Sequence, residues 1–221
     1  MKKTILILII THFSFCSFGQ GGPSIAVDYE MPMGGLGEIY NPTIGYTLNH
    51  ISYKDNSNPV WNISLGYYKF KPKEDFFVEQ NGSETATSQY SEYTVIPLYI
   101  GISQNIEASN VVSILPGVDM GYFYTWYNYE IKIKKLDWVH GGYITSSIGG
   151  DEIQGRGVLS PKLNVLIKIS PTIHLQLRTK YNLFFALGSS DSGSVNYNSS
   201  VGQVNHSMSH GAAIVFFFNK G

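Results

Sequence analysis

The chain has 221 residues, which suits a single domain, and its formal net charge is −1. Charged residues make up 14% of it, against ~25% in a typical soluble domain, and aromatic residues make up another 14%. So small a net charge gives no electrostatic footprint for nucleic acid, and no nucleic-acid partner is expected. Few charges and many aromatic side chains favour instead a protein whose outer wall contacts lipid.

The N-terminal residues carry the three parts of a secretory signal peptide. Residues 2–3 are both lysine, Ile5–Ile10 begins an apolar stretch, and Ser17–Gly19 has the small-x-small form of a cleavage site. The apolar stretch is too short for a membrane-spanning helix, which needs about 18 apolar residues or more. We therefore predict a signal peptide over residues 1–19 and one β-barrel domain over residues 20–221.

Cys16 is the only cysteine of the chain. One interpretation is a lipid-anchored cysteine, although the residue before it, Phe15, is larger than lipoprotein signals prefer. The other is an ordinary residue of the signal peptide that is removed at cleavage. On this second interpretation the mature chain has no cysteine, which excludes disulfides, cysteine-zinc sites and cysteine nucleophiles.

Eight segments of the mature chain alternate between apolar and polar residues with the period of two that indicates a β-strand. Pro97 and Pro116 fall inside two of them, where we expect bulges or strand ends because proline cannot donate to the ladder. In chain order the segments are Ser24–Met31, Thr43–Asn49, Trp61–Phe70, Tyr93–Ser103, Val111–Trp126, Lys162–Ile169, Ile173–Asn182 and Ser207–Phe218.

The connectors between these segments alternate in length, as they do in outer-membrane barrels with tight periplasmic turns and long extracellular loops. We therefore predict an all-β fold, a closed antiparallel up-and-down transmembrane β-barrel of eight strands. Alternation within Tyr127–Lys134 indicates that the third long connector extends a hairpin above the membrane. The short connectors are Lys54–Asn58, Gln104–Asn110 and Ser170–Thr172, and the long ones are Gly34–Pro42, Lys71–Gln89, Tyr127–Gly157 and Gly188–Asn205.

Alternation does not say which face lies inside, since a lipocalin-like soluble barrel turns its apolar face inward. The polar face carries charges of both signs among glycines. A narrow lumen accepts glycine beside large residues, whereas a solvated strand is weakened by it. We therefore predict a lumen charge network in preference to ordinary surface charges. Its residues are Asp28, Glu30, Asp119, Lys162, Lys168, Arg178 and Lys180.

The chain also resembles a known group of barrels. The stretches that carry the resemblance are Val95–Leu98, which opens a strand, Leu177–Leu183 and a final strand that ends in Phe216–Phe218. The mature chain resembles, in pattern, the small outer-membrane β-barrel families of the Bacteroidetes, whose architecture is that of OmpA's transmembrane domain and OmpX. The resemblance implies insertion by the barrel-insertion machinery and no enzymatic residues. Asn219–Gly221 follow the last aromatic residue, which departs from the usual C-terminal pattern.

One pair of residues has the spacing of a catalytic pair. A class of barrels that modify lipid A uses a histidine as base and a serine as nucleophile, two residues apart on a strand. Outside the predicted signal peptide, only His50 and Ser52 have that spacing. They lie beside the short connector Lys54–Asn58, hence at the periplasmic end, whereas lipid A lies in the outer leaflet. No catalytic residue is therefore predicted, and a lipid A-modifying hydrolase or acyltransferase is the alternative.

Two groups of residues are candidate metal ligands. His206 and His210 share one face of the last strand, but no carboxylate lies within a few residues of them. Asp137, Asp151 and Glu152 belong to the third long connector, and their spacing matches no calcium-binding loop. Neither a metal nor a cofactor is predicted.

Eight strands enclose a lumen that side chains can fill, so a large pore is not expected and the long loops must carry any function. The third loop mixes aromatic and basic residues, which suits a partner protein, a glycan or a lipopolysaccharide headgroup. The same residues also suit simple packing of a hairpin. The candidate interaction residues are Trp126, Tyr127, Trp138 and Tyr143.

The sequence thus predicts an integral outer-membrane barrel with a structural or interaction role and no catalysis. Its expected partners are outer-membrane lipids and lipopolysaccharide, the insertion machinery during biogenesis, and an envelope protein. Besides the lipid A-modifying enzyme, the alternative is an accessory subunit of a secretion or gliding complex, which rests on analogy.

Overall fold

The computed structural model describes residues 20–53, 59–82, 84–137, 139–186 and 206–217. The predicted signal peptide with Cys16, the first short connector, Trp138 and the fourth long connector lie outside these residues. Among the described residues, none belongs to a helix long and apolar enough to cross a membrane.

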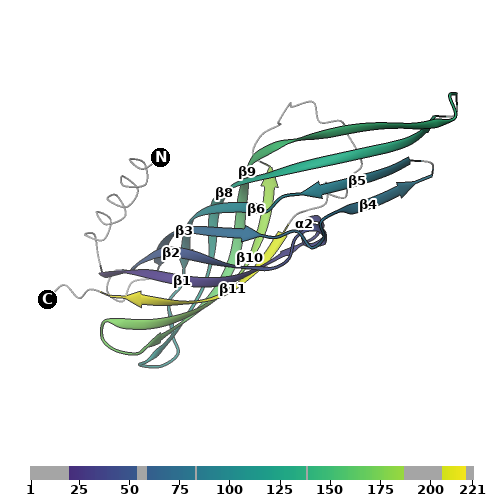
Figure 1. Ribbon diagram of the computed structural model, residues 1–221. Helices are drawn as coiled ribbons and strands as arrows, with labels where there is room; N and C mark the ends of the chain where they lie inside the picture. Colours follow the sequence, from purple (N-terminus) through teal and green to yellow (C-terminus); the bar gives the residue numbers. More distant parts are fainter. Residues whose placement is uncertain (1–19, 54–58, 83, 138, 187–205, 218–221) are drawn as a thin grey trace, which may run out of the picture.

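Eight antiparallel strands form a closed barrel, and each overlaps one predicted segment (Figure 1). Each wall strand pairs with the wall strands before and after it in the chain, and β1 pairs with β11 to close the wall. The predicted fold class, a closed up-and-down barrel of eight strands, is confirmed. The wall strands are β1 (Gln20–Met33), β2 (Thr43–Tyr53), β3 (Val60–Phe70), β6 (Tyr93–Ser103), β8 (Val112–Asp137), β9 (Gly142–Lys168), β10 (Ile173–Ala186) and β11 (His206–Phe216).

Three predicted connectors contain regular structure that the sequence pattern did not reveal. The first long connector includes the single-turn helix α2 (Gly35–Ile39), and the second forms the hairpin of β4 (Phe77–Asn81) and β5 (Glu84–Tyr90). The short strand β7 (Ile106–Glu107) pairs with the start of β8. The strand β5 consists mostly of small polar residues, so apolar alternation could not identify it. It is a strand because it pairs with β8 along its whole length.

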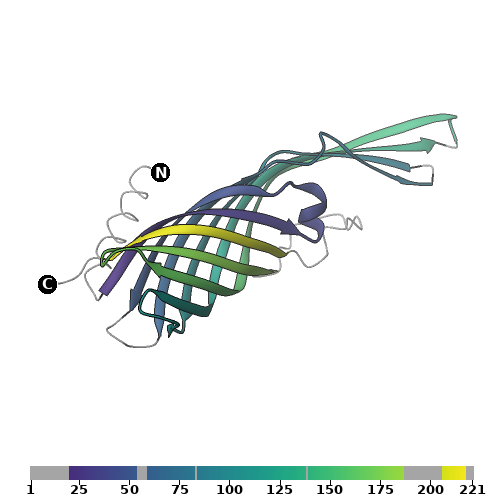
Figure 2. The same ribbon diagram turned by 90° about the horizontal axis from the view of Figure 1, so that it is seen from below.

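The strands β8 and β9 continue far beyond the barrel as a hairpin, as expected for the third long connector. Their register is unbroken from Val112 opposite Ile167 to Asp137 opposite Gly142. The β4–β5 hairpin joins the same sheet through β5. We call the four-stranded part formed by β4, β5 and the β8–β9 hairpin beyond Trp126 the projecting sheet; it extends away from one end of the barrel (Figures 1 and 2).

The two faces of the wall differ in polarity as predicted. Large apolar side chains are exposed on the outside, and buried polar and charged side chains point inward through the middle of the lumen. This is the pattern of a barrel whose outer wall contacts lipid, and it is the reverse of a soluble barrel. Exposed wall residues include Ile25, Val27, Ile44, Leu48, Ile100, Met120, Leu163, Leu177 and Ile214.

The prolines in the wall do not form bulges. Pairing between β6 and β3 is interrupted opposite Pro97 and then resumes in the same register, whereas a bulge would shift it by one residue. Pro116 lies in the unbroken β8–β9 register, and its carbonyl accepts a 2.9 Å hydrogen bond from the amide of Gln104 just past the end of β6. The expected bulges are therefore wrong, while Pro116 does lie at the end of the pairing with β6.

Candidate functional site

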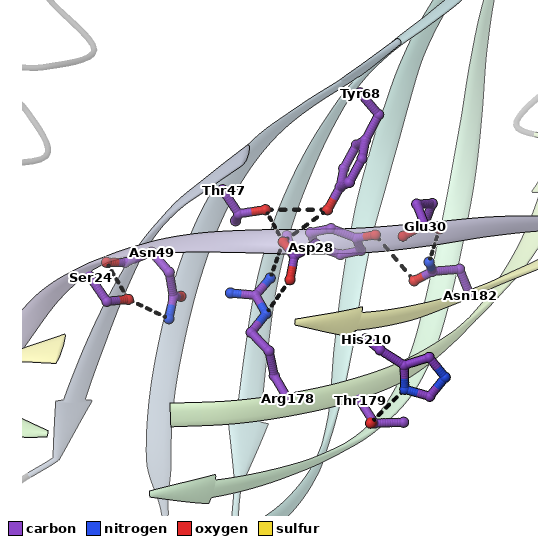
Figure 3. A network of polar contacts seen from close by, with 11 residues as sticks. Ser24, Asp28, Glu30, Thr47, Asn49, Tyr68, Arg178, Thr179, Asn182 and His210 are labelled. Carbon is purple, nitrogen blue, oxygen red and sulfur yellow. Dashed lines mark hydrogen bonds and ion pairs between the residues drawn. The ribbon is translucent and has the colours of Figure 1, made fainter. Parts of the chain in front are cut away.

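The middle of the lumen contains an ion pair between Asp28 of β1 and Arg178 of β10 (Figure 3). The guanidinium Nε lies 3.0 Å from Oδ1, and Nη2 donates to Oδ2 over 3.1 Å. The hydroxyls of Thr47 and Tyr68 also donate to Oδ2, over 2.6 and 3.1 Å. Asp28 is fully buried. The ion pair is needed because an unpaired carboxylate in the same place would cost several kcal/mol.

A glycine makes this ion pair possible. Gly211 of β11 lies between the two partners, directly opposite Asp28 on one side and Arg178 on the other. A Cβ added at Gly211 would lie 2.0 Å from the Asp28 carboxylate. The arginine side chain therefore crosses β11 at the one position that has no side chain to block it.

A second cluster is centred on Glu30 and Asn182. Glu30 lies two residues after Asp28 on β1, nearer the projecting sheet. Glu30 Oε1 accepts hydrogen bonds from Asn182 Nδ2 at 2.8 Å and from the hydroxyl of Ser207. The Asn182 Oδ1 accepts from Tyr99 at 3.1 Å and from Ser160 at 2.7 Å. All five residues are buried, so this network ties strands β1, β6, β9, β10 and β11 together inside the barrel.

The third cluster joins Asp119 of β8 to Lys162 of β9. Lys162 Nζ lies 2.5 Å from Asp119 Oδ1, and Asn62 of β3 donates to the same oxygen over 3.1 Å. Lys162 also donates to the Asn62 side chain. Here too a glycine lies between two partners, because Gly101 of β6 is directly opposite Asn62 on one side and Asp119 on the other. A Cβ added at Gly101 would lie 1.8 Å from the Asp119 oxygen.

The last two predicted network residues behave differently. Lys180 is buried, and its ammonium has no hydrogen-bond acceptor among the described residues, but it lies 3.8 Å from the centroid of the Tyr99 ring. This cation–π contact replaces part of the lost hydration. Lys168 is exposed at the last residue of β9, so its placement in the lumen is corrected. Its side chain reaches water at the end of the barrel farthest from the projecting sheet.

The described lumen is filled. One cavity of about 20 Å³ lies among Asn62, Asp119 and Lys162, and another of about 20 Å³ lies nearer the projecting sheet. Each has room for roughly one water molecule, which needs ~10–15 Å³ by the same measure. The lumen therefore works as a packed polar core.

Aromatic residues close the end of the lumen below the projecting sheet. The rings of Phe123 and Phe184 meet at 4.7 Å between centroids, and those of Tyr40 and Tyr93 at 5.3 Å. Leu36 of α2 packs against this cluster from above. Burial raises the pKa of the Tyr40 hydroxyl, which therefore stays neutral at the mouth of the barrel.

The projecting sheet has one mixed-charge face and one more apolar face. Register and alternation place Lys132 and Lys134 on the face that continues the outer wall, and Ile131 and Ile133 on the face that continues the lumen. Among the described residues its outer edge is unpaired, because β10 pairs with β9 only as far as Arg156. Above that residue no described strand pairs with the free side of β9.

The predicted aromatic interaction residues do not form one patch. Trp126 packs on Tyr124 on the outer face, whereas the Tyr127 ring contacts Tyr93 on the lumen side. Tyr143 lies near the tip, 63% exposed, with the ammonium of Lys134 4.2 Å from its ring centroid. Trp138 is outside the described residues. Adjacent strand residues point to opposite faces, which separates Trp126 from Tyr127.

The candidate catalytic residues and the candidate metal-binding histidines lie at two separate places in the barrel. His50 is buried and Ser52 half-buried near the end of β2 that lies farthest from the projecting sheet. His206 and His210 contact different residues of β10, at Tyr181 and Thr179 respectively. The part of the chain that the structure describes contains no group of three or more histidine, cysteine, aspartate or glutamate residues able to hold a metal ion.

Sequence reasoning missed the neutral members of the lumen network. Tyr68, Tyr99, Asn62 and Asn182 each bind a charged residue or its immediate partner. Asn182 carried a signal, since it lies on the polar face of the clearest predicted strand. Tyr68 shares the polar face of its predicted strand with Asn62, but tyrosine is equally common in interfacial girdles, so neither tyrosine was assigned to the lumen.

The fold and the lumen together define a small closed barrel with an apolar outside and a polar, filled inside. No family model and no curated protein matches the chain. Among solved structures, Neisserial surface protein A aligns with a TM-score of 0.52 and 10% identity over 90% of this chain and 97% of that one. The attachment invasion locus protein Ail of Yersinia pestis, in complex with the heparin analogue sucrose octasulfate, aligns with a TM-score of 0.51 and 10% identity. The alignment covers 90% of this chain and 99% of Ail. A major outer membrane protein of Thermus thermophilus aligns with a TM-score of 0.51 and 8% identity, over 90% of this chain and 99% of that one. At these identities the likeness concerns the fold.

Proposed function

We propose that this protein is an integral outer-membrane barrel that acts as an interaction scaffold and presents the projecting sheet outside the cell. The observation that carries the proposal is an apolar wall around a filled polar lumen, with β8 and β9 continuing beyond the wall. Such a wall is stable against lipid, and a filled lumen leaves the external segments to act. The signal peptide predicted for residues 1–19 would export the chain.

The open edge of β9 supports a binding role for the projecting sheet. Protected edge strands are short or carry proline or charged side chains, whereas the free side of β9 is long and contains neither from Gly142 to Gly150. Ile144 and Ile153 are exposed on it, at 59% and 63%. A long edge with exposed apolar side chains is suited to adding a strand from a protein partner.

The remaining partners follow from the same placement. The apolar wall would contact outer-membrane lipids and lipopolysaccharide, and β11 would be read by the insertion machinery. A sulfated glycan is a second candidate ligand, since Lys132 and Lys134 are exposed on one face of the sheet and Ail is seen with a heparin analogue. Against it, Glu130 lies 3.3 Å from the Lys132 ammonium and reduces the positive charge of that face.

A truncation of the projecting hairpin tests the proposal. Glu130 pairs with Gly149, so a two-residue turn that joins them removes 131–148 and leaves the barrel intact. We expect both forms to sediment with outer membranes, external protease to clip only the full-length form within the hairpin, and only that form to retain an envelope protein in a pull-down. Sucrose octasulfate binding, measured on both, tests the glycan. Equal retention by both forms would contradict the interaction role.

The lipid A-modifying enzyme is the alternative of another class, and its candidate pair lies at the wrong end of the barrel. Mass spectrometry of lipid A from a deletion strain tests this alternative, since an unchanged lipid A profile would exclude a lipid A-modifying activity. The identity of the envelope protein that the full-length form retains in the pull-down decides whether the barrel is a subunit of a secretion or gliding complex.

A further inference from the structure

A histidine lies within the apolar outer wall. His210 of β11 is directly opposite Tyr29 of β1 and Thr179 of β10, and its Nδ1 lies 3.0 Å from the Thr179 hydroxyl (Figure 3). Apolar or aromatic rows lie on both sides of it along the strands. The row toward the projecting sheet is Met31, Met208 and Tyr181, and the row toward the other end is Val27, Ala212 and Leu177.

The position of His210 places it inside the membrane, far from any headgroup. Beyond Ala212 the same face of β11 continues with Ile214 and Phe216, both exposed. At ~3.3 Å per residue and a strand tilt of ~40°, these rows extend about 15 Å toward that end of the barrel. On β10, Tyr181, Leu183 and Phe185 continue the outer face over a similar height in the other direction, and Leu183 and Phe185 are exposed. The histidine therefore lies near the middle of the ~25 Å apolar band of a barrel. Lipid chains offer no hydrogen bond at this depth, and polar groups there are costly.

The histidine has an unused hydrogen-bonding group. Thr179 occupies Nδ1, and no described residue hydrogen-bonds to the other ring nitrogen, Nε2. In a neutral imidazole one nitrogen donates and the other accepts. If Nδ1 accepts from Thr179, Nε2 is a donor, and if Nδ1 donates, Nε2 is an acceptor. His210 can therefore offer either role to a partner in the membrane.

We propose that the wall formed by β1, β11 and β10 binds a second copy of this chain in the membrane, with the two His210 side chains meeting at a two-fold axis. The inference rests on the membrane location proposed above and adds an interface that the projecting sheet does not need. Copies of one chain lie at the same depth, so a two-fold axis along the membrane normal brings His210 to its own mate.

Two features favour a second copy over another occupant. The two imidazoles complement each other when one Nε2 donates and the other accepts, so no other polar group is required. Ala212, next on the same face, is small and lets two walls approach closely, as small residues do between membrane helices.

Cysteine cross-linking in bilayers tests the proposal. In a Cys16→Ser background, Ala212→Cys places a thiol beside the expected axis, and Leu98→Cys places one on β6, a strand remote from β11 and 42% exposed. The purified full chain is folded into phospholipid vesicles, diluted with excess lipid and treated with a short bismaleimide. We expect linked dimers from Ala212→Cys and few from Leu98→Cys.

The histidine is then removed with a matched control. His210→Leu should lower the dimer association constant by roughly three- to tenfold, the range for one hydrogen bond inside a membrane. His206→Leu, which removes a histidine four residues away on the same face, should leave it unchanged. Equal cross-linking at both cysteines, dimers insensitive to His210→Leu, or monomers at every lipid ratio overturn the inference. Linkage to a different protein when native envelopes are treated likewise assigns the wall to another partner and overturns it. If the chain does not insert into the vesicles, seen as loss of the heat-modifiable band, both the dimer interface and the proposed function as a membrane barrel are contradicted.

Discussion

The lumen and the projecting sheet share strands β8 and β9, which pair in one unbroken register, yet the two regions use charge differently. In the lumen, Asp119 and Lys162 meet at 2.5 Å with side chains 5% and 4% exposed. In the projecting sheet, Glu130 and Lys132 lie 3.3 Å apart and are 45% and 56% exposed. Burial makes the first pair essential, because neither ion has water as a substitute, whereas exposure makes the second nearly neutral.

The largest effect expected from this contrast follows Arg178→Leu. The substitution leaves the Asp28 carboxylate buried with only neutral donors, and breaking a buried pair in this way costs about 3–5 kcal/mol. The folded barrel should lose its heat-modifiable gel mobility at a lower temperature and unfold at a lower urea concentration in detergent.

The double substitution Asp28→Asn with Arg178→Leu is the matched control. It removes both charges, and we expect it to recover part of the lost stability because no unpaired ion remains. If Arg178→Leu alone left mobility and unfolding unchanged, the inward network would not be what holds the barrel together.

A smaller difference should separate glycines of the two regions. Gly211→Ala puts a methyl group 2.0 Å from Asp28 and 2.7 Å from the carbonyl of Val27, so about 1–3 kcal/mol of stability should be lost through overpacking. Gly150→Ala, on the projecting part of β9, has no neighbour within 4 Å and should be neutral or slightly stabilising. Urea unfolding of the two variants beside the parent measures both changes in stability. Equal losses of stability would contradict the difference in packing between the lumen and the projecting sheet.

The fold was predictable because the signals behind it are local. Alternation, a period set by the backbone, located all eight wall strands, and Tyr93–Ser103 has the predicted bounds. The strand β5 was not predictable, since its small polar residues form a strand only by pairing with β8. Pro97 does not produce the expected bulge, because the ladder tolerates a missing donor without shifting its register.

The lumen network was predictable only in its charged members. Charges on a glycine-rich polar face indicated Asp28 and Arg178, but the strand register that brings them together across Gly211 is a tertiary property. Lys168 shares that face and still lies outside the lumen, because periodicity gives the side of the wall and not the height along it. The same limit hid His210, whose position within the apolar wall emerges from pairing with β1 and β10.

The smallest effect is expected in the projecting sheet. Lys132→Ala removes an exposed ion pair with Glu130, and the free energy of unfolding of the barrel should change by less than about 0.5 kcal/mol. Lys162→Ala, the matched substitution on the lumen side, leaves Asp119 without its cation and should be far more destabilising. Urea unfolding of both variants, at low and at high salt, makes the comparison. Added salt should reduce the small change in unfolding free energy caused by Lys132→Ala and leave the larger change caused by Lys162→Ala as it is. Salt screens exposed charges and hardly screens buried ones. A salt-sensitive Lys162 effect would mean that water enters the lumen freely, and the filled interior described above would then be wrong.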